Sequence, residues 1–302
     1  MKSGFVAILG RPNAGKSTLL NALIGEKVAI VTPKPQTTRN RIAGVVEVPA
    51  RKRVHPAAQI VFVDTPGVHK PSSQLDRRML QEVHAALETR DVVLVLVDAS
   101  RRVGLETFVE EDERKTTADP LPQAQGRLST AQVAKDATGF TQEDKANRDD
   151  STISNAKSRG PSWDSEEEFL FGLIRGLDCP VFLVLTKIDL VAKDKLLPLI
   201  DTLTRKHNFA EVIPVSARKR DGLDVLVQKI VEALPTGERY YPKDQYTDQP
   251  QRFMVAELIR ERILVETGEE VPYASAVVIE QYEEAEPPAP PRKKGQAPAR
   301  LP

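Results

Sequence analysis

Short, nearly uninterrupted apolar runs alternate along this chain with segments in which apolar residues recur at helical spacing. The apolar runs predict six strands, at residues 5–9, 43–48, 59–63, 92–98, 181–186 and 211–215. The helical patterns lie near residues 16–24, 75–89, 166–176, 194–206 and 222–233. This alternation predicts an α/β fold with a doubly wound, mostly parallel sheet, in which residues 43–48 and 59–63 form an antiparallel hairpin.

Two segments interrupt this pattern. Residues 110–164 are rich in Thr, Ser, Asp, Lys and Gln and show no sustained period, so they are predicted to be a disordered insertion, whose simplest interpretation is a tolerated loop and whose alternative is a partner-binding segment. The last residues, 283–302, are Pro-rich and are predicted to be a disordered tail. The main domain is therefore expected at 1–109 and 165–236, with a smaller unit at 237–282.

Composition narrows the protein class. The 302 residues carry 43 basic and 43 acidic side chains, so no global field attracts nucleic acid or anionic lipid, and such contacts would need a local patch. A single cysteine, Cys179, excludes a disulfide within the chain and is typical of a reducing cytoplasm. No apolar run is long enough to span a membrane, and the N-terminus lacks a signal-peptide layout. A cytoplasmic protein is expected.

The stretch GRPNAGKST follows the first predicted strand and leads into the first predicted helix. It matches G, four residues, G-K-S, the pattern of a phosphate loop; a plain glycine turn is the alternative for this stretch alone. Lys16 would reach the β- and γ-phosphates, and the Ser17 hydroxyl would bind Mg²⁺. The remaining candidates for phosphate contact are Gly10, Arg11, Pro12, Asn13, Ala14, Gly15 and Thr18.

Three further loops follow strands in the order expected of a P-loop NTPase. Asp64, at the start of DTPG, can hold Mg²⁺ through a water, and the amide of Gly67 can meet a γ-phosphate. In TKID, Asp189 can accept both adjacent donors of a guanine base, which adenine does not offer. Each loop alone is compatible with an ordinary turn, whereas together they predict one GTP site. Its other members are Thr65, Pro66, Thr186, Lys187, Ile188, Ser216, Ala217 and Arg218.

The ordered motifs GRPNAGKST, KPQTTRNRIAG, DTPGVHKP, TKID and VSAR resemble those of the Era family of bacterial GTPases, over residues 4–100 and 168–280. The resemblance implies binding of GTP and GDP, hydrolysis of GTP, and a Mg²⁺ ligand at Thr37 or Thr38, of which Thr38 is favoured. It also implies 16S rRNA and the small ribosomal subunit as partners, peripheral contact with the inner face of the cell membrane, and a monomer.

Two positions depart from common GTPase patterns. Val68 stands where many GTPases place a Gln after the DTPG glycine, so no side-chain amide orients the attacking water there. The resemblance implies that Asn13 binds a K⁺ ion that acts as an arginine finger does; the alternative is an Asn that caps its own turn. Thr186 replaces the family's usual Asn, so guanine selectivity is expected to survive with some loss of nucleotide affinity.

Residues after Pro235 resemble the entry to the family's C-terminal KH domain, with an amphipathic helix near residues 250–265 and a strand near SAVVIE, residues 275–280. KH domains clamp single-stranded RNA with a GxxG loop, and none of the 16 glycines has another three positions on. The sequence predicts a partial KH-like unit with impaired RNA recognition. Three functions remain open: an Era-like enzyme, a nucleotide-dependent interaction switch, and a truncated variant that only binds nucleotide.

Overall fold

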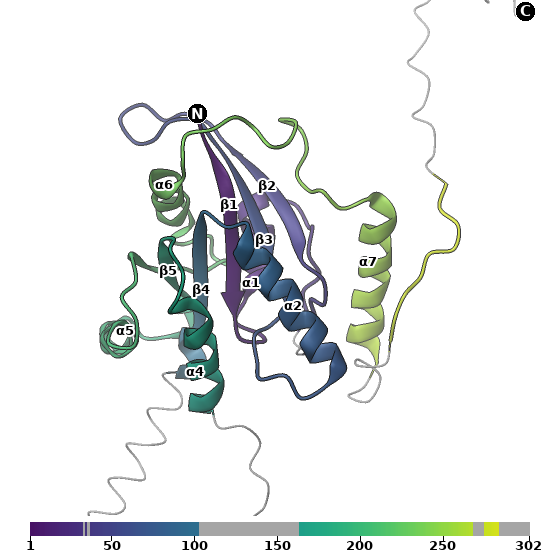
Figure 1. Ribbon diagram of the computed structural model, residues 1–302, viewed down its shortest axis with the longest axis horizontal. Coiled ribbons are helices and arrows are strands. Elements are labelled where there is room, and N and C mark those ends of the chain that lie inside the picture. Colours follow the sequence, from purple (N-terminus) through teal and green to yellow (C-terminus); the bar gives the residue numbers. More distant parts are fainter. Residues whose placement is uncertain (33, 35–36, 103–162, 268–274, 284–302) are drawn as a thin grey trace, which may run out of the picture.

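A six-stranded sheet forms the centre of the computed structural model, which describes residues 1–32, 34, 37–102, 163–267 and 275–283 (Figure 1). Its strands lie in the order β2-β3-β1-β4-β5-β6. Strand β2 is antiparallel to β3, and the other neighbours are parallel, as predicted. The strands are β1 (Lys2–Gly10), β2 (Ile42–Val48), β3 (Ala58–Asp64), β4 (Val92–Asp98), β5 (Val181–Thr186) and β6 (Glu211–Pro214).

Helices cover both faces of the sheet, which confirms the doubly wound arrangement. On one face, α1 (Lys16–Ile24) and α6 (Leu223–Ala233) pack against alternate residues of β1 such as Val6 and Ile8. On the other face, Ala7 and Leu9 of the same strand meet the remaining sheet-covering helices. Those helices are α2 (Gln74–Glu88), α4 (Trp163–Ile174) and α5 (Leu196–Thr204), and two short 3₁₀ turns at Ile188–Leu190 and Lys193–Lys195 precede α5.

The register of the parallel strands brings their carboxyl ends to one edge. Gly10 of β1 lies beside Leu96 of β4, and Asp98 of β4 lies beside Thr186 of β5. Helix α1 starts at this edge, immediately after Gly15, whose φ of 93° is a left-handed conformation that favours glycine. The loops that carry the predicted motifs therefore leave the sheet side by side, which is the arrangement that a ligand site needs.

The predicted boundaries of the insertion and the tail need one correction. Residues 163–164 belong to α4 rather than to the insertion, because the hydrogen-bonded turns of a helix extend beyond the periodic apolar positions from which the sequence locates it. The rest of the predicted insertion, and the tail from residue 284 onward, lie outside the described residues.

The chain after α6 crosses the end of the sheet and follows the free edge of β2 before it enters α7 (Gln251–Glu266), which stands beside the domain (Figure 1). The amide of Val45 donates to the carbonyl of Tyr246 at 2.9 Å, so this segment is hydrogen-bonded to the β2 edge. Buried Gln59 accepts hydrogen bonds from the amides of Tyr240 and Tyr241 at 2.7 and 3.0 Å. The connection to α7 is thus anchored at two places.

Two predictions about this C-terminal unit are wrong. Helix α7 is not amphipathic in the expected sense, because Leu258 and Ile259 are each 42% exposed whereas the charged Arg260 is buried. Residues 275–280 form no strand, and Val278 in their middle is 78% exposed. A strand needs a neighbour to pair with, and none lies beside these residues in the described part of the chain.

Candidate functional site

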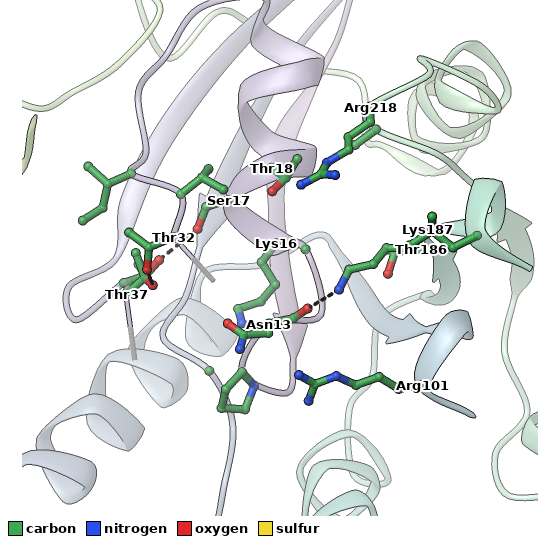
Figure 2. Close-up of a pocket in the computed structure, with 18 of the residues that line it drawn as sticks. Asn13, Lys16, Ser17, Thr18, Thr32, Thr37, Arg101, Thr186, Lys187 and Arg218 are labelled. Atoms are coloured by element: carbon green, nitrogen blue, oxygen red, sulfur yellow. Dashed lines mark hydrogen bonds between the residues drawn. The ribbon is translucent and has the colours of Figure 1, made fainter. Parts of the chain in front are cut away.

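A cavity of about 550 Å³ lies at the carboxyl edge of the sheet, where the phosphate loop, the segment around Thr38 and the loops after β5 and β6 converge (Figure 2). Most residues predicted from the motifs line it. They are Pro12, Asn13, Gly15, Lys16, Ser17, Thr18, Thr38, Gly67, Thr186, Lys187, Asp189, Ala217 and Arg218. Loops far apart in the sequence thus form one continuous wall, as the order of the motifs indicated.

The other predicted residues do not line the cavity, and two of them form contacts that hold its loops in place. Thr65 donates its hydroxyl to the carbonyl of Ile8 at 2.7 Å, which fixes the DTPG loop against β1. The Arg11 side chain forms an ion pair with Glu166 of α4. Gly10, Arg11, Ala14, Asp64, Thr65, Pro66, Ile188 and Ser216 are absent from the cavity lining.

Thr37, the alternative Mg²⁺ ligand named from the sequence, also lines the cavity. The motifs did not predict five further lining residues: Ile30, Val31, Thr32, Arg101 and Leu190. Arg101 comes three residues after the end of β4, and its guanidinium reaches toward the space around Asn13 (Figure 2). Its place after a central parallel strand was the signal that could have identified it, since that edge carries the other loops. Ile30 to Thr32 lie in an irregular loop, for which no comparable sequence signal exists.

Lys16, the first residue of α1 at the end of the phosphate loop, is only 6% exposed. Its Nζ donates to the carbonyls of Gly10 and Arg11, both at 3.2 Å. Burial lowers the pKa of Lys16 from 10.5 to about 8, and the negative charge of Asp64 opposes that shift. Two neutral backbone carbonyls thus hold the ammonium group in place. A phosphate can displace them, because its charged oxygens form stronger hydrogen bonds with an ammonium group.

Three oxygen-bearing side chains meet beside Lys16. The Ser17 hydroxyl donates to Asp64 Oδ2 at 2.6 Å and lies 2.9 Å from the Thr38 hydroxyl. Asp64 is completely buried, and burial raises the pKa of its carboxyl, although Lys16 and the hydroxyls of Ser17 and Thr38 pull it back. The second oxygen, Oδ1, is buried and has no hydrogen-bond partner in the described part of the chain. Hard oxygen ligands around a partnerless carboxylate oxygen fit Mg²⁺.

The DTPG loop is pressed against the phosphate loop. A side chain on Gly67 would place its Cβ 2.8–2.9 Å from atoms of Pro12, so only glycine allows this approach. The amide of Val68 donates to the Gly10 carbonyl at 3.0 Å, and its side chain, 1% exposed, is buried with Ala7 and Leu9 in the apolar core. Val68 therefore anchors the loop and offers no side chain to a water in the cavity.

His69 continues the DTPG loop and connects it to α2. Its Nδ1 lies 3.0 Å from the Gly67 carbonyl, and its Nε2 lies 2.9 Å from Asp76 Oδ1. Asp76 closes a capping box with Ser73 at the start of α2. Burial by itself raises the pKa of Asp76, but hydrogen bonds from Ser72, His69 and Ser73 outweigh it and hold the pKa well below its usual range. The position of Gly67 thus depends on the helix cap.

The base-binding side of the cavity is organised by Asp189. The Ser216 hydroxyl donates to Asp189 Oδ1 at 2.6 Å, a contact between the TKID and VSAR loops. Ser216 therefore orients the carboxylate, a role that the motif did not reveal. Lys187, with a left-handed φ of 59°, donates from Nζ to the Asn13 carbonyl at 2.9 Å and to Asp98 at 2.6 Å (Figure 2). The loops for base and phosphate are locked together by these contacts.

Comparison with known proteins gives the site its family. Residues 5–122 match the family described as 50S ribosome-binding GTPase. GTPase Era of Syntrophus aciditrophicus is 38% identical over 285 residues, which is 94% of this chain and 71% of the relative. GTPase Era of Lacticaseibacillus paracasei is 39% identical over 284 residues, which is 94% of this chain and 72% of that relative. The chain belongs to the Era family of GTPases.

Solved structures of Era proteins share the architecture. Era in complex with MgGDPNP and nucleotides 1506–1542 of 16S ribosomal RNA superposes with a TM-score of 0.65 at 34% identity, over 91% of this chain and 70% of that one. A point variant of Aquifex aeolicus Era bound to GDP and AlF₄⁻ gives the same score and identity, over 90% of this chain and 70% of that one. As an Era-family member this chain is a GTP-hydrolysing enzyme that binds guanine nucleotide and Mg²⁺.

None of the helices in the described ranges is both long and apolar enough to cross a membrane.

Proposed function

We propose that this chain hydrolyses GTP at the cavity between the phosphate loop and the TKID and VSAR loops, with Mg²⁺ held by Ser17, Thr38 and, through a water, Asp64. The partnerless Oδ1 of Asp64 supports this assignment most directly, because a buried carboxylate oxygen without a hydrogen bond is costly, and a water bound to Mg²⁺ would donate one to it. Mg²⁺ supplies charge neutralisation on the phosphate oxygens.

Each phosphate contact comes from a residue that lines the cavity. Lys16 exchanges its backbone acceptors for the β- and γ-phosphates, and the amides at the start of α1 bind the α- and β-phosphates. The amide of Gly67 meets the γ-phosphate. Since the side chain of Val68 is buried, backbone groups or a bound partner orient the attacking water, and slow intrinsic turnover is expected.

Substitution of the metal ligands tests this arrangement. Ser17→Ala removes one oxygen ligand, and Asp64→Asn removes the carboxylate charge that accepts from the metal-bound water; both are expected to weaken Mg²⁺-dependent binding of nucleotide by at least about tenfold. Thr202→Ala is a matched control, because its hydroxyl only donates to the Pro198 carbonyl on exposed α5. Nucleotide affinity that is independent of Mg²⁺ in the unmodified protein would refute the assignment.

Asn13 is the proposed ligand of a K⁺ ion that neutralises charge between the β- and γ-phosphates. It lines the cavity, but its φ of 63° also explains an Asn without any ion, because Asn tolerates the left-handed region. Asn13→Gly separates the two explanations, since glycine keeps this backbone and removes the side-chain oxygen. If Asn13 binds K⁺, this variant loses the stimulation of hydrolysis by K⁺ over Na⁺; retained stimulation would exclude that role.

The proposed macromolecular partner is 16S rRNA, in the assembly of the small ribosomal subunit, as the Era–RNA complex suggests by similarity. The second candidate, which the sequence analysis left open, is a protein that binds and hydrolyses GTP but recognises RNA poorly. An oligonucleotide with the sequence of the 16S rRNA 3′ end distinguishes them. Affinity equal to that of a relative with a complete KH domain supports the first, and affinity no better than for a scrambled oligonucleotide supports the second.

A further inference from the structure

Helix α7 contacts Lys27, Val31, Lys34 and Thr37, which precede Thr38 in the chain. Glu261 of α7 accepts a hydrogen bond from the amide of Val31 at 3.1 Å and forms an ion pair with Lys27. Lys34 donates its Nζ to the carbonyl of Thr267, at the end of the helix. These contacts join segments more than 220 residues apart in the sequence, and they follow the loop toward Thr38.

Arg260 is the buried charge in this interface. Its side chain is 5% exposed, and Nε and Nη2 donate to the carboxylate of Glu257 at 2.9 and 2.5 Å. Nη2 also donates to the carbonyl of Thr37 at 2.6 Å. A buried guanidinium in a bidentate pair has little freedom, because turning it would break both bonds to Glu257, although Nη1 has no hydrogen-bond partner among the described residues. The Thr37 carbonyl is therefore held by a rigid donor.

The peptide that Arg260 holds is the one that precedes Thr38. Thr38 is 6% exposed, and its hydroxyl lies 2.9 Å from Ser17 Oγ and 3.4 Å from Asp64 Oδ2. The Thr37 hydroxyl instead donates to the Lys34 carbonyl at 2.7 Å. Since a peptide is planar, a fixed carbonyl at Thr37 also fixes the direction in which the chain enters Thr38. A continuous path of contacts thus runs from Glu257 to the three oxygen groups beside Lys16.

We propose that Arg260 is a positioning residue for GTP: through the Thr37 carbonyl it holds Thr38 in the orientation that binds Mg²⁺ beside a γ-phosphate. This inference rests on the proposed role of Thr38. In GTPases, the loop that carries such a threonine is ordered by contacts with Mg²⁺ and the γ-phosphate, and it is released when the γ-phosphate leaves. A residue that orders the loop beforehand lowers the entropy lost on binding GTP and has little effect on GDP.

Arg260→Met removes the donors while it keeps an unbranched side chain of similar reach. Arg262→Met is the matched control, since Arg262 lies two residues along the same helix, is 79% exposed and only approaches Glu266 at 3.8 Å. Arg260→Lys keeps the charge beside Glu257 with one donor group, and it provides the same measurement if the Met variant does not fold. Affinities for a non-hydrolysable GTP analogue and for GDP, both with Mg²⁺, are measured alongside hydrogen exchange of residues 37–41.

We expect Arg260→Met to weaken binding of the GTP analogue about tenfold and that of GDP less than about twofold, with faster exchange at residues 37–41, while Arg260→Lys is intermediate and Arg262→Met is unchanged. Equal losses for the two nucleotides, or no loss, would overturn the positioning role and leave a packing contact. If the unmodified protein binds the GTP analogue without any dependence on Mg²⁺, the proposed function fails instead, so the two failures are distinguishable.

Discussion

The hydroxyl of Thr186, at the end of β5, donates to the carbonyl of Ala14 in the phosphate loop at 2.7 Å. Both residues are almost completely buried, and the same hydroxyl lies 3.3 Å from the carbonyl of Val97. The resemblance to the Era family implies an Asn at this position, whose longer side chain would tie the base loop to the phosphate loop. Thr186 makes that connection with one hydroxyl, so the two halves of the site remain joined.

Thr186→Val should weaken binding of both GTP and GDP about fivefold, because one buried hydrogen bond contributes about 1 kcal/mol and its loss leaves the Ala14 carbonyl unpaired. Thr186→Ser, which keeps the hydroxyl, should stay near the original affinity. Equilibrium titration with a fluorescent guanine nucleotide measures both. Identical affinities for the Val and Ser variants would show that the connection does not matter for binding.

Asp189→Asn should change the preferred base from guanine to xanthine. The carboxylate accepts from the guanine N1–H and exocyclic amine, whereas an Asn amide can donate to the carbonyl that xanthine carries in place of that amine. The expected result is a loss of GTP affinity of at least about a hundredfold with a gain in XTP affinity. Competition between GTP and XTP measures the change, and an unchanged preference for GTP would remove Asp189 from the base site.

Asp76→Asn should lower the free energy of unfolding by about 2 kcal/mol at pH 7, because the carboxylate accepts the bonds that start α2 and bind His69. The pKa of Asp76 is lowered below its ordinary value of 3.8 in the folded protein. Its contribution to stability is therefore complete above that value and is lost as the pH falls below it.

Urea unfolding at a series of pH values measures this effect. The difference in unfolding free energy between the unmodified protein and Asp76→Asn should be present in full at pH 7 and should shrink below about pH 4. Asp224→Asn, an exposed acid in the first turn of α6, is the control and should show a small difference. A difference that grows as the pH falls would contradict the assigned sign.

The sheet and its loops could be predicted from the sequence because local patterns determine them. Each buried parallel strand, such as residues 92–98, is a short apolar run, and each motif follows a run directly, which places Asp64 and Thr186 at one edge. The bond between Ser216 and Asp189 was not predicted, since it depends on how two loops meet in space.

The C-terminal unit was less accessible to sequence reasoning. The apolar residues of SAVVIE suggested a strand, but pairing depends on a neighbour that no local pattern specifies. Arg260 would ordinarily be assigned to a solvent-facing side of α7, because a buried charge is predicted only when its partners are known. Its partner across the interface, Thr37, lies 223 residues earlier in the chain.

Single-turnover hydrolysis of GTP with Mg²⁺ tests most directly whether this cavity hydrolyses GTP. It is measured in K⁺ and in Na⁺, with Lys16→Ala as the control. We expect slow conversion of GTP to GDP and phosphate, faster in K⁺ than in Na⁺, and none with Lys16→Ala, which lacks the buried ammonium of the phosphate loop. Equal rates in the two salts would contradict only the role of Asn13. No turnover in either salt would contradict the proposal that this cavity hydrolyses GTP.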